Sequence, residues 1–587
     1  MTAVSDRHRL QPANQGFAGW VDMSSPTPRL SAEVDSGVVG CRVWWRGFLA
    51  NRSTLLTELG LGAEPSCPDE RLVAAAYRRW GAAVQAHLLG EYALVVWDEA
   101  THSLVLTHDA LGVVPLYYSM RGRTIYFGSH LSLLAKLIPG PDLDESYIAE
   151  FLLRGQCLGD RTIYRDVRRL GVGRTLRYRA PGGSELQTWW LGDVPELRYR
   201  DPRDYDEHFR QLLQSAISTA VDGRTWSELS GGLDSSSIAC TAHHLGVEDF
   251  ATISVIYPAS TTSDESSWIQ VVQAAKRLPR HLIDGDKHKP LSILPNRSIE
   301  EPSRLHITWP VFSEYETLCG ANGVDVVLSG FGGDQVLFGE TDYPIHVADH
   351  VRRLKLISAV RQVAQWSPTA SGRSLTHRVL TTAAIPALSY LRGHAIRYQY
   401  EGAVPQRCSW VCPSLLEQTG VGDDAVGAPT PRMPTVRGQA YYEQIWRMAS
   451  GAGQHWGQNT TAYRWRYPLL YRPLVEFMYS LPWQQQVISG QDRLLQRRAL
   501  TGILPEQIRT RRTKSGPAQA IYEGLAANRE VYHLLTDRPL AAQRGYVDQA
   551  SWRIAVEAAQ FGVVRSAAAF EAAVSLEIWL RQQDGQL

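Results

Sequence analysis

The chain has 587 residues, of which 44% are hydrophobic, enough for more than one domain with a large apolar core. Its 60 basic and 59 acidic residues nearly cancel, so we expect no long-range attraction to nucleic acid or to an anionic membrane. The first residues are polar where a secretion signal would be apolar, and no stretch reaches the roughly 18 consecutive apolar residues of a membrane span. These features predict a globular cytoplasmic protein with no membrane span and no nucleic-acid partner.

The seven cysteines are scattered, odd in number, and form no CxxC or Cys/His cluster of the zinc type. Cys408 and Cys412 are the one close pair, and their spacing alone is a weak indication of a metal. We therefore expect reduced thiols that are mostly buried.

The first part of the chain contains short runs of β-branched and aromatic residues separated by Gly, Asp and charged turns, a pattern typical of β-strands. Between the first two runs, residues 67–90 carry apolar side chains at helical spacing, for example Leu72, Ala76 and Trp80, with Ala75 beside them. The mixture indicates an antiparallel sheet with packed helices. The predicted strands are 41–50, 90–100, 102–109, 113–120 and 124–129.

A domain boundary is predicted at 189–208, where Pro and charged residues accumulate before a helical apolar stripe begins. That stripe consists of Phe209, Leu212, Leu213, Ala216, Ile217 and Ala220. Strands and helices then alternate, which indicates a parallel sheet covered on both faces. The alternating segments are strand 224–229, helix 236–246, strand 249–258, helix 264–278 and strand 323–330.

The remainder of the chain is predicted to be mostly helical from about residue 345, with a Gly- and Pro-rich loop at 419–438 and a last helix at 567–583. The predicted domains are residues 1–195 and residues 205–587. The second contains a helical extension at about 345–460.

The turn "SGGLDSS", residues 230–236, follows a predicted strand and opens a helix with the apolar face Ile238, Ala239, Ala242 and Leu245. Gly231 and Gly232 let the backbone turn tightly and approach a ligand. Ser235 and Ser236 place hydroxyl and amide groups at the positive end of the helix, which suits a phosphate. The bland alternative is a capped strand-to-helix turn of any α/β protein.

A second turn, "SGFGGDQ" at residues 329–335, repeats this design after the predicted strand 323–330. Asp234 and Asp334 would repel a phosphate unless a divalent cation lies between them. Carboxylates on two strand ends can hold Mg²⁺, which takes oxygen ligands and bridges phosphates. The chain has no GxxxxGK[ST] motif, so a P-loop is excluded.

These motifs resemble those of the asparagine synthetase-like amide-forming enzymes, which cleave ATP to AMP and pyrophosphate and activate a carboxylate as an acyl-adenylate. "SGGLDSS" is similar to their pyrophosphatase loop, residues 90–119 to the sheet core of their glutaminase domain, and "LPEQIRTRRTKSG" (504–516) to a basic segment near their carboxyl end. The resemblance covers most of the chain. It implies an α/β protein with an N-terminal glutaminase-like (Ntn-type) αββα sandwich, then a parallel-sheet adenylation domain of the ATP pyrophosphatase type.

The resemblance also implies roles for particular residues. Mg²⁺ would be held by Asp234 and Asp334, and Lys514 would contact the polyphosphate and the developing oxyanion, although a solvated surface lysine is the plain alternative. The backbone near Val255 would hold adenine, and Ser329 and Gly330 would line the nucleotide. The ATP phosphates would be bound by Ser230, Gly231, Gly232, Leu233, Asp234, Ser235 and Ser236.

The chain departs from this family in its first domain. A glutaminase of this type needs an N-terminal cysteine, and residue 2 is Thr2. The Asn-Gly-Glu that holds glutamine is replaced by Arg46-Gly47-Phe48. Ammonia from glutamine is therefore not expected, and this domain should be structural or a surface for partners.

A second departure lies in the adenylation site, where Phe331 stands at the position of a Glu or Tyr that serves the attacking amine. A phenyl ring cannot take a proton. Either another group is the base, with Glu340 a weak candidate, or the amine arrives neutral and positioning does most of the work.

Because ammonia is excluded, the amine should come from the substrate. Gln335, the stretch 407–420 and the long Arg-, Tyr- and Trp-rich region 351–456 resemble lasso peptide cyclases, which join a peptide's N-terminal amine to an Asp or Glu side chain. That branch implies ribosomal-peptide antibiotic biosynthesis, with a linear core peptide as substrate and a leader-binding protein and a leader peptidase as partners. The alternatives are a β-lactam synthetase-like enzyme acting on a small β-amino acid, a glutamine-dependent synthetase, and an inactive peptide-binding scaffold.

Overall fold

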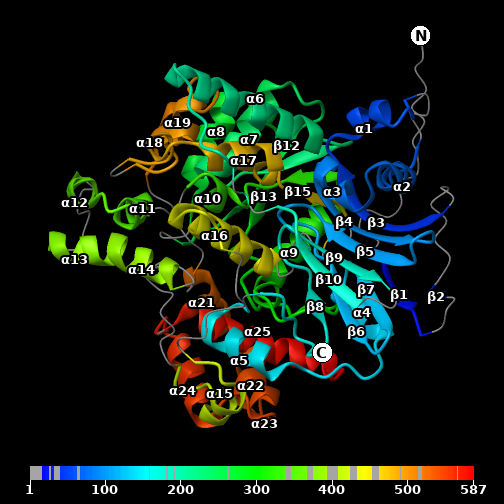
Figure 1. Ribbon diagram of the computed structural model, residues 1–587. Coiled ribbons are helices and arrows are strands. Elements are labelled where there is room, and N and C mark those ends of the chain that lie inside the picture. The colour runs from blue at the N-terminus through cyan, green and yellow to red at the C-terminus, as the bar shows by residue number, and fades with distance from the viewer. Residues whose placement is uncertain are drawn as a thin grey trace.

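The protein is described by a computed structural model that places two sheet-containing regions side by side, with helices covering both (Figure 1). Its N-terminal strands lie on one side, the parallel sheet on the other, and the last helices close one end. The described residues are 16–24, 28–31, 40–62, 67–157, 159–179, 183–190, 192, 194–260, 264–338, 345–365, 374–392, 408–422, 432–452, 460, 462–488, 491–512, 518–564 and 566–587.

The N-terminal region contains two antiparallel sheets, each of five strands within the described residues, in the orders β2-β1-β7-β6-β8 and β10-β9-β5-β4-β3. The strands are β1 (Ala18–Asp22), β2 (Arg29–Leu30), β3 (Cys41–Leu49), β4 (Gly90–Asp98), β5 (Ser103–His108), β6 (Tyr117–Arg121), β7 (Thr124–Gly128), β8 (Arg168–Arg169), β9 (Arg174–Arg179) and β10 (Gly183–Thr188).

Strand β4 explains why these sheets form a stack. Its alternate side chains enter two different cores: Ala93, Val95 and Trp97 pack between the two sheets, whereas Leu94 and Val96 pack against a helical layer. A strand with a neighbour on each face is apolar at every position, so "YALVVW" shows no polar alternation.

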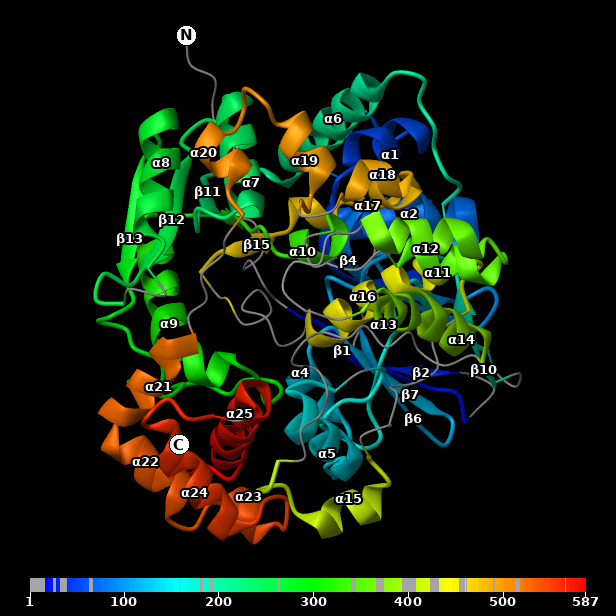
Figure 2. The same ribbon diagram turned by 90° about the vertical axis from the view of Figure 1, so that its left-hand side faces the viewer.

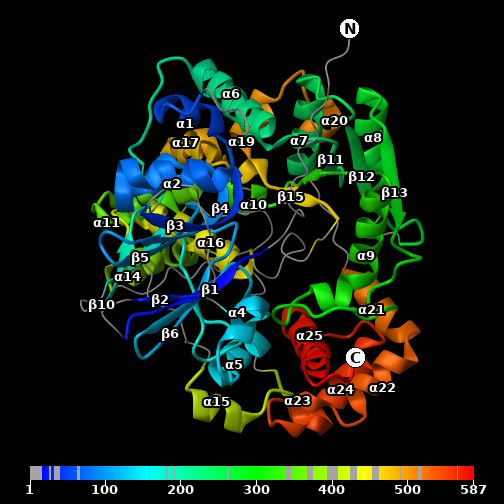
Figure 3. The ribbon, with the colours of Figure 1, turned by 90° about the vertical axis from the view of Figure 1, so that its right-hand side faces the viewer.

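Helices α1 (Arg52–Glu58), α2 (Asp69–Trp80) and α3 (Val84–His87) cover the outer face of one sheet, and α4 (Leu131–Leu137) and α5 (Glu145–Arg154) lie beyond the other (Figure 3). The order of layers is helix, sheet, sheet, helix. This confirms the αββα sandwich that the family resemblance implied.

Two details of this region differ from the prediction. The predicted helix 67–90 is interrupted, because α2 ends at Trp80 and Gly81 has a φ of 57° before the 3-10 turn η1 (Gly81–Ala83) and α3. The predicted strand 113–120 begins only at Tyr117. The other four predicted strands are confirmed.

The second region is built on a parallel sheet of five strands within the described chain, in the order β13-β12-β11-β14-β15. The three predicted strands correspond to β11 (Thr225–Glu228), β12 (Ala251–Ile256) and β14 (Val326–Leu328), and β13 is Arg280–Asp284. The edge strand β15 (Arg464–Arg466) was missed, because three residues with two arginines give no strand pattern.

Helices cover both faces of this sheet, as Figure 2 shows for α7, α8 and α9. One face packs on α6 (Pro202–Ala220), α7 (Leu233–His244) and α8 (Ser266–Lys276), and the other on α9 (Leu305–Ala321). The stripe predicted on α6 is confirmed, although Leu212 is only partly buried. On α7, Leu245 was expected in the apolar face but is 37% exposed, because the helix ends at His244.

The rest of the chain is largely helical, as predicted. Helices between Ile345 and residue 452 include α12 to α14, which project from the body of the molecule (Figure 1). They are α11 (His346–Arg352), α12 (Leu356–Gln365), α13 (Leu375–Val379), the π-helical turn η2 (Leu380–Ala384), α14 (Ile385–Leu391), α15 (Pro413–Thr419) and α16 (Val436–Ala452).

The later helices surround the parallel sheet and close the end of the molecule at α25. They are α10 (Gly333–Val336), η4 (Pro468–Leu470), α17 (Arg472–Ser480), α18 (Trp483–Gln486), α19 (Leu494–Ala499), α20 (Glu506–Thr510), α21 (Ala518–Ala527), α22 (Arg529–Thr536), α23 (Leu540–Gln543), α24 (Gln549–Ala559) and α25 (Ala567–Gln583). In the described part of the chain, no helix is long and apolar enough to cross a membrane.

Buried ion pairs join the sandwich to the second region. Arg169 Nη2 of β8 lies 2.7 Å from Glu301 Oε2, and the two side chains are 6% and 1% exposed. Glu91 Oε1 of β4 accepts a hydrogen bond of 2.8 Å from the Tyr467 backbone N–H, and its other oxygen lies 3.8 Å from Arg466 Nη1. Charged groups buried in this way fix the two regions against each other, because separating either pair would strand a charge away from water.

All seven cysteines are free thiols in the structure, and six of them are buried. Burial raises the pKa of Cys240 and of Cys319 to about 12, so both are neutral thiols near pH 7. The expectation of reduced, mostly buried cysteines is confirmed.

Candidate active site

A cavity of about 800 Å³ opens at the carboxyl ends of β11, β12 and β14. Ligands of open parallel sheets bind at this edge, where loops and helix N-termini gather. Both turns that the sequence singled out line the cavity, together with aromatic and arginine side chains from later in the chain. The predicted site residues on its wall are Ser230, Gly232, Leu233, Asp234, Ser235, Val255, Ser329, Gly330 and Asp334.

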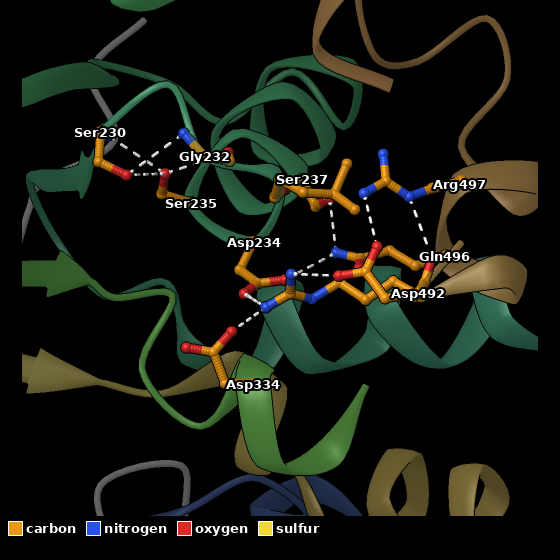
Figure 4. A network of polar contacts seen from close by, with 11 residues as sticks. Ser230, Gly232, Asp234, Ser235, Ser237, Asp334, Asp492, Gln496 and Arg497 are labelled. Atoms are coloured by element: carbon orange, nitrogen blue, oxygen red, sulfur yellow. Dashed lines mark hydrogen bonds and ion pairs between the residues drawn. The ribbon is translucent and has the colours of Figure 1, made fainter. Parts of the chain in front are cut away.

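The first turn joins β11 to α7 and is closed by its own serines (Figure 4). Ser230 Oγ lies 3.0 Å from Ser235 Oγ, and the Ser230 N–H donates to Ser235 Oγ over 3.2 Å. Gly231 has a φ of 72°, and a Cβ on it would lie 2.5 Å from Trp268 Cβ, so only glycine fits. The first N–H groups of the 12-residue helix α7 have no acceptor within the helix, and this end therefore suits an anion.

The second turn lies against the first because two of its residues have no side chain. A Cβ on Gly330 would come within 2.9 Å of the Ser235 backbone nitrogen. A Cβ on Gly333 would come within 2.5 Å of Asp234 Cγ. The glycines at these positions therefore allow the close approach that brings Asp334 next to Asp234, as the sequence predicted.

The two carboxylates converge on one guanidinium (Figure 4). Arg493 Nη2 lies 2.8 Å from Asp234 Oδ2 and also forms an ion pair with Asp334 Oδ1. Burial lowers the pKa of Arg493, but the carboxylates of Asp234, Asp334 and Asp492 more than offset this effect, so its pKa lies above the ordinary value. The space between the two aspartates is thus a cation position.

Arg493 is held by neighbours that the sequence did not single out. Gln496 Nε2 donates to Asp234 Oδ1 over 3.2 Å and to Ser237 Oγ over 3.0 Å. Asp492 pairs with Arg493 and, over 2.9 Å, with Arg497 Nη2. These residues lie before the basic segment 504–516, and the available signal was the group of three arginines at positions 493, 497 and 498.

Arg511, from that same segment, supports the first turn from outside. Its Nη1 donates to the Gly231 carbonyl oxygen over 2.9 Å, and its guanidinium lies 4.6 Å from the centre of the Trp268 ring. The other terminal nitrogen of the guanidinium, Nη2, forms an ion pair with Glu265. The basic segment 504–516 therefore reaches the turn at residues 230–236, and Arg511 and Arg512 both line the cavity.

Two of the predicted site residues that the structure describes, Gly231 and Ser236, are not on the cavity wall. Gly231 packs against Trp268 and shapes the turn from behind. Ser236 is fully buried, its N–H donates to the Gly232 carbonyl oxygen over 3.1 Å, and its hydroxyl has no hydrogen-bond partner among the described residues. The expectation that Ser236 presents its hydroxyl to a ligand is corrected, because the helix already begins at Leu233 and turns this side chain into the packing. Lys514 lies outside the described residues.

The groups on the cavity wall suit a nucleotide polyphosphate with a divalent ion. Positive charge from Arg493, Arg497, Arg511 and Arg512 and the start of α7 can face phosphates. No group of three or more His, Cys, Asp and Glu side chains within the described residues is arranged as a metal site. Asp234 and Asp334 would therefore hold Mg²⁺ as a pair, with phosphate and water oxygens completing its shell.

The opposite wall is aromatic and carries one carboxylate. The rings of Phe331 and Tyr467 meet edge to face with centroids 5.5 Å apart, and Tyr315 and Trp465 also line the cavity. Glu228, the last residue of β11, faces the same space. Burial raises the pKa of Glu228 to about 7, against a hydrogen bond from Ser329 that lowers it.

Arg46, Gly47 and Phe48, which the resemblance puts in place of the glutamine-binding motif, are engaged in packing. Phe48 lies under the guanidinium of Arg466, with 4.0 Å between that group and the ring centre, and Arg46 Nη1 donates to the Ser129 carbonyl oxygen over 3.2 Å. A Cβ on Gly47 would lie 2.1 Å from the Glu91 carbonyl oxygen. The side chains of Arg46 and Phe48 therefore stabilise the packing of the sandwich. Thr2 lies outside the described residues.

Comparison with known proteins agrees with this architecture. The asparagine synthase family model matches residues 208–581, and the glutamine amidotransferase domain model matches residues 51–190. The glutamine-hydrolyzing asparagine synthetase 3 of Bacillus subtilis is 23% identical over 529 residues, covering 83% of this chain and 78% of that protein.

Two further similarities are weaker. Amidase chyE of Penicillium rubens is 25% identical over 362 residues, covering 54% of this chain and 52% of its own. Among solved structures, the B. subtilis glutamine phosphoribosylpyrophosphate amidotransferase complexed with ADP and GMP has a TM-score of 0.22 at 13% identity, over 54% of this chain and 85% of that chain, too low to support an argument. The family model spans well over half of the sequence and coincides with the parallel-sheet region, and the chain therefore belongs to the asparagine synthase family.

Proposed function

We propose that this protein is an ATP-dependent amide-forming ligase that closes a macrolactam within a peptide, by adenylating an Asp or Glu side chain and joining it to the peptide's own N-terminal amine. The observation that carries the proposal is the convergence of Asp234, Asp334 and Arg493 below two glycine turns in one cavity. Family membership supports the ATP-dependent amide chemistry.

The chain's own groups can bind and orient ATP. The start of α7 and the turn from Ser230 to Ser235 lie where the phosphates of ATP would enter, and Val255, Ser329 and Gly330 would line the nucleoside. When bound, Mg²⁺ would neutralise phosphate charge as the substrate carboxylate attacks the α-phosphorus. Arg493 would then turn from the aspartates toward the departing pyrophosphate. A guanidinium can donate two parallel hydrogen bonds to the oxygens of one phosphate group.

The amine should come from the substrate itself. By the resemblance, Arg46 and Phe48 replace the groups that hold glutamine in the glutaminase domain. The side chains of Phe331, Tyr467, Trp465 and Tyr315 form a broad apolar wall that suits a peptide better than a small polar metabolite. Lys514 would stabilise the tetrahedral oxyanion before AMP departs.

The implied setting is part of the same proposal. The substrate would be a linear core peptide in the cytoplasm, released by a leader peptidase that acts with a leader-binding protein, as in ribosomal-peptide antibiotic biosynthesis. These partners rest on the resemblance of Gln335 and of residues 407–420 to lasso peptide cyclases.

ATP–pyrophosphate exchange tests this proposal with a panel of carboxylates. The panel contains peptides with a free N-terminus and an internal Asp or Glu, the same peptides acetylated at the N-terminus, free aspartate, and N-carboxyalkyl β-amino acids. We expect exchange with both peptide sets and, with the free-amine set alone, a product lighter by one water. Turnover of the β-amino acid alone would favour a β-lactam synthetase-like enzyme, and no exchange with any carboxylate would favour an inactive scaffold.

A further inference from the structure

We propose that Glu228 is the catalytic base that takes a proton from the attacking amine in place of the missing acid at Phe331; this inference rests on the proposed function. Glu228 ends β11, directly before the phosphate-binding turn, and lines the same cavity as Phe331. It therefore lies within the space in which substrate and nucleotide would meet.

The direction of the Glu228 side chain follows from the strand. Trp226, two residues earlier, packs in the core with Tyr315 and Trp465, on the face of the sheet that α9 covers. Side chains two residues apart in a strand point to the same face, so Glu228 also points toward α9 and the aromatic wall. Burial raises the pKa of both Tyr315 and Tyr467, and the charge of Glu228 adds to the rise in each, which agrees with this placement.

Glu228 differs from the other carboxylates of the cavity. Asp234, Asp334 and Asp492 all pair with Arg493. Glu228 has no cation beside it among the described residues and interacts instead with the Ser329 hydroxyl. Ser329 Oγ in turn accepts a hydrogen bond of 3.2 Å from the Phe331 N–H, so Glu228 is connected through one residue to the position at which the base is missing.

The protonation behaviour of Glu228 suits this role. Burial raises its pKa to about 7, and a general base works best when its pKa lies near the working pH. The titratable groups that face it are Tyr315 and Cys319 on α9, and Tyr463 and Tyr467 beside β15. All four have raised pKa values, so they stay neutral near pH 7. Glu91 acts on Tyr467 from the sandwich and has a pKa of about 7 itself.

The step balances as follows. Glu228 takes one proton from the substrate ammonium group, and the freed electron pair forms the C–N bond to the acyl carbon of the adenylate. The C–O bond to AMP then breaks and its electrons leave with the phosphate. The second proton of the nitrogen goes to a phosphate oxygen of AMP, so no further reactant is needed.

The test compares adenylation with amide formation in Glu228→Gln and Glu228→Asp, using a peptide of the panel that supports exchange in the wild type. We expect Glu228→Gln to keep ATP–pyrophosphate exchange within about threefold of the wild type while amide formation falls about 100-fold or more. Glu228→Asp should recover part of the loss. The limb near pH 7 in the rate of amide formation should disappear in Glu228→Gln. Hydroxylamine, which is uncharged at neutral pH, should give hydroxamate at similar rates with both proteins.

Glu300→Gln is the matched control, because burial raises the pKa of Glu300 to about 7 as well, but Glu300 lies at the junction near Ser132. The pH profile of amide formation by Glu300→Gln should keep the same limb near pH 7 as the wild type. The proposal is overturned if Glu228→Gln forms amide normally, or if exchange and amide formation fall together, since the residue would then serve nucleotide binding or folding. Absence of exchange in the wild type would instead remove the proposed function on which this inference rests.

Discussion

The two halves of the molecule use their polar residues in opposite ways. In the parallel-sheet region, Asp234, Asp334 and Arg493 face a cavity and each other. In the sandwich, Glu91 and Arg169 face the neighbouring region and are buried in the junction. The first arrangement suits a ligand, and the second suits a fixed contact between domains.

We expect the sandwich to have no glutaminase reaction, and the comparison shows what else its residues do. Phe48 stands where the glutaminase pattern has an acid, yet it packs under Arg466, which directly precedes the cavity residue Tyr467. Glu91 binds the backbone of Tyr467. The sandwich therefore supports one wall of the cavity in the neighbouring domain.

The largest expected effect is on the cavity side of this comparison. Asp234→Ala should abolish product formation, because one half of the carboxylate pair that would hold Mg²⁺ is lost. Lys514→Ala should do the same through loss of the oxyanion contact. Product is measured by mass spectrometry, and circular dichroism should show that both variants remain folded. A fully active Asp234→Ala would contradict the assignment of the carboxylate pair.

On the junction side, Arg169→Ala should cost about 3 to 5 kcal/mol of unfolding free energy, because Glu301 would be left charged and buried. The matched control is Arg42→Ala, since the Arg42–Glu99 pair is 31% and 45% exposed and should contribute less than about 1 kcal/mol. Denaturant titration of both variants makes the comparison. Equal losses would mean that the junction is not held by its buried charges.

A smaller effect concerns the pH dependence of stability. Burial raises the pKa of Glu91 and of Glu300 to about 7, from 4.5 for an ordinary glutamate. The folded state therefore takes up protons as it forms, and the stability from these groups is complete below pH 4.5 and is lost as pH rises through 7. Each group should account for up to about 3 kcal/mol, and Glu300→Gln should flatten the slope. The measurement is the melting temperature between pH 5 and pH 8. A slope against pH that is the same in Glu300→Gln and in the wild type would contradict this assignment.

The smallest expected effect is none at all. Added glutamine should neither be hydrolysed by the wild type nor speed product formation, because Arg46 and Phe48, which the resemblance puts in place of the glutamine-binding groups, are engaged in packing. A coupled glutamate assay checks this, with a glutamine-hydrolyzing asparagine synthetase as the positive control. Glutamate released by this protein would show that the sandwich still has its reaction.

Much of this architecture could be predicted because short sequence patterns determine it. The two glycine turns follow apolar strands, and parallel strands end at one edge, so the meeting of Asp234 and Asp334 followed from the sequence. The short strand β15 gave no pattern and was missed.

Arg493 and Glu228 could not be predicted in the same way. Arg493 reaches Asp234 from a distant part of the chain, and the sequence around Arg493 contains no pattern that predicts this contact. Glu228 stands in an ordinary strand position, and only the packing of Tyr315 and Trp465 around the cavity shows that its carboxylate faces a binding space. The prediction for Ser236 was wrong because the direction of a serine side chain depends on the residue at which α7 begins, and a sequence pattern does not fix that residue.

The most direct test of the central claim follows oxygen from the substrate carboxylate. A peptide with a free N-terminus and an internal Asp or Glu, labelled with ¹⁸O in that side chain, is incubated with the full chain, ATP and Mg²⁺, and the AMP is analysed by mass spectrometry. The account predicts pyrophosphate, one ¹⁸O atom in each AMP, and a ring-closed peptide that keeps the second ¹⁸O of the side chain in its new amide. Label in orthophosphate, with ADP as the nucleotide product, would contradict it.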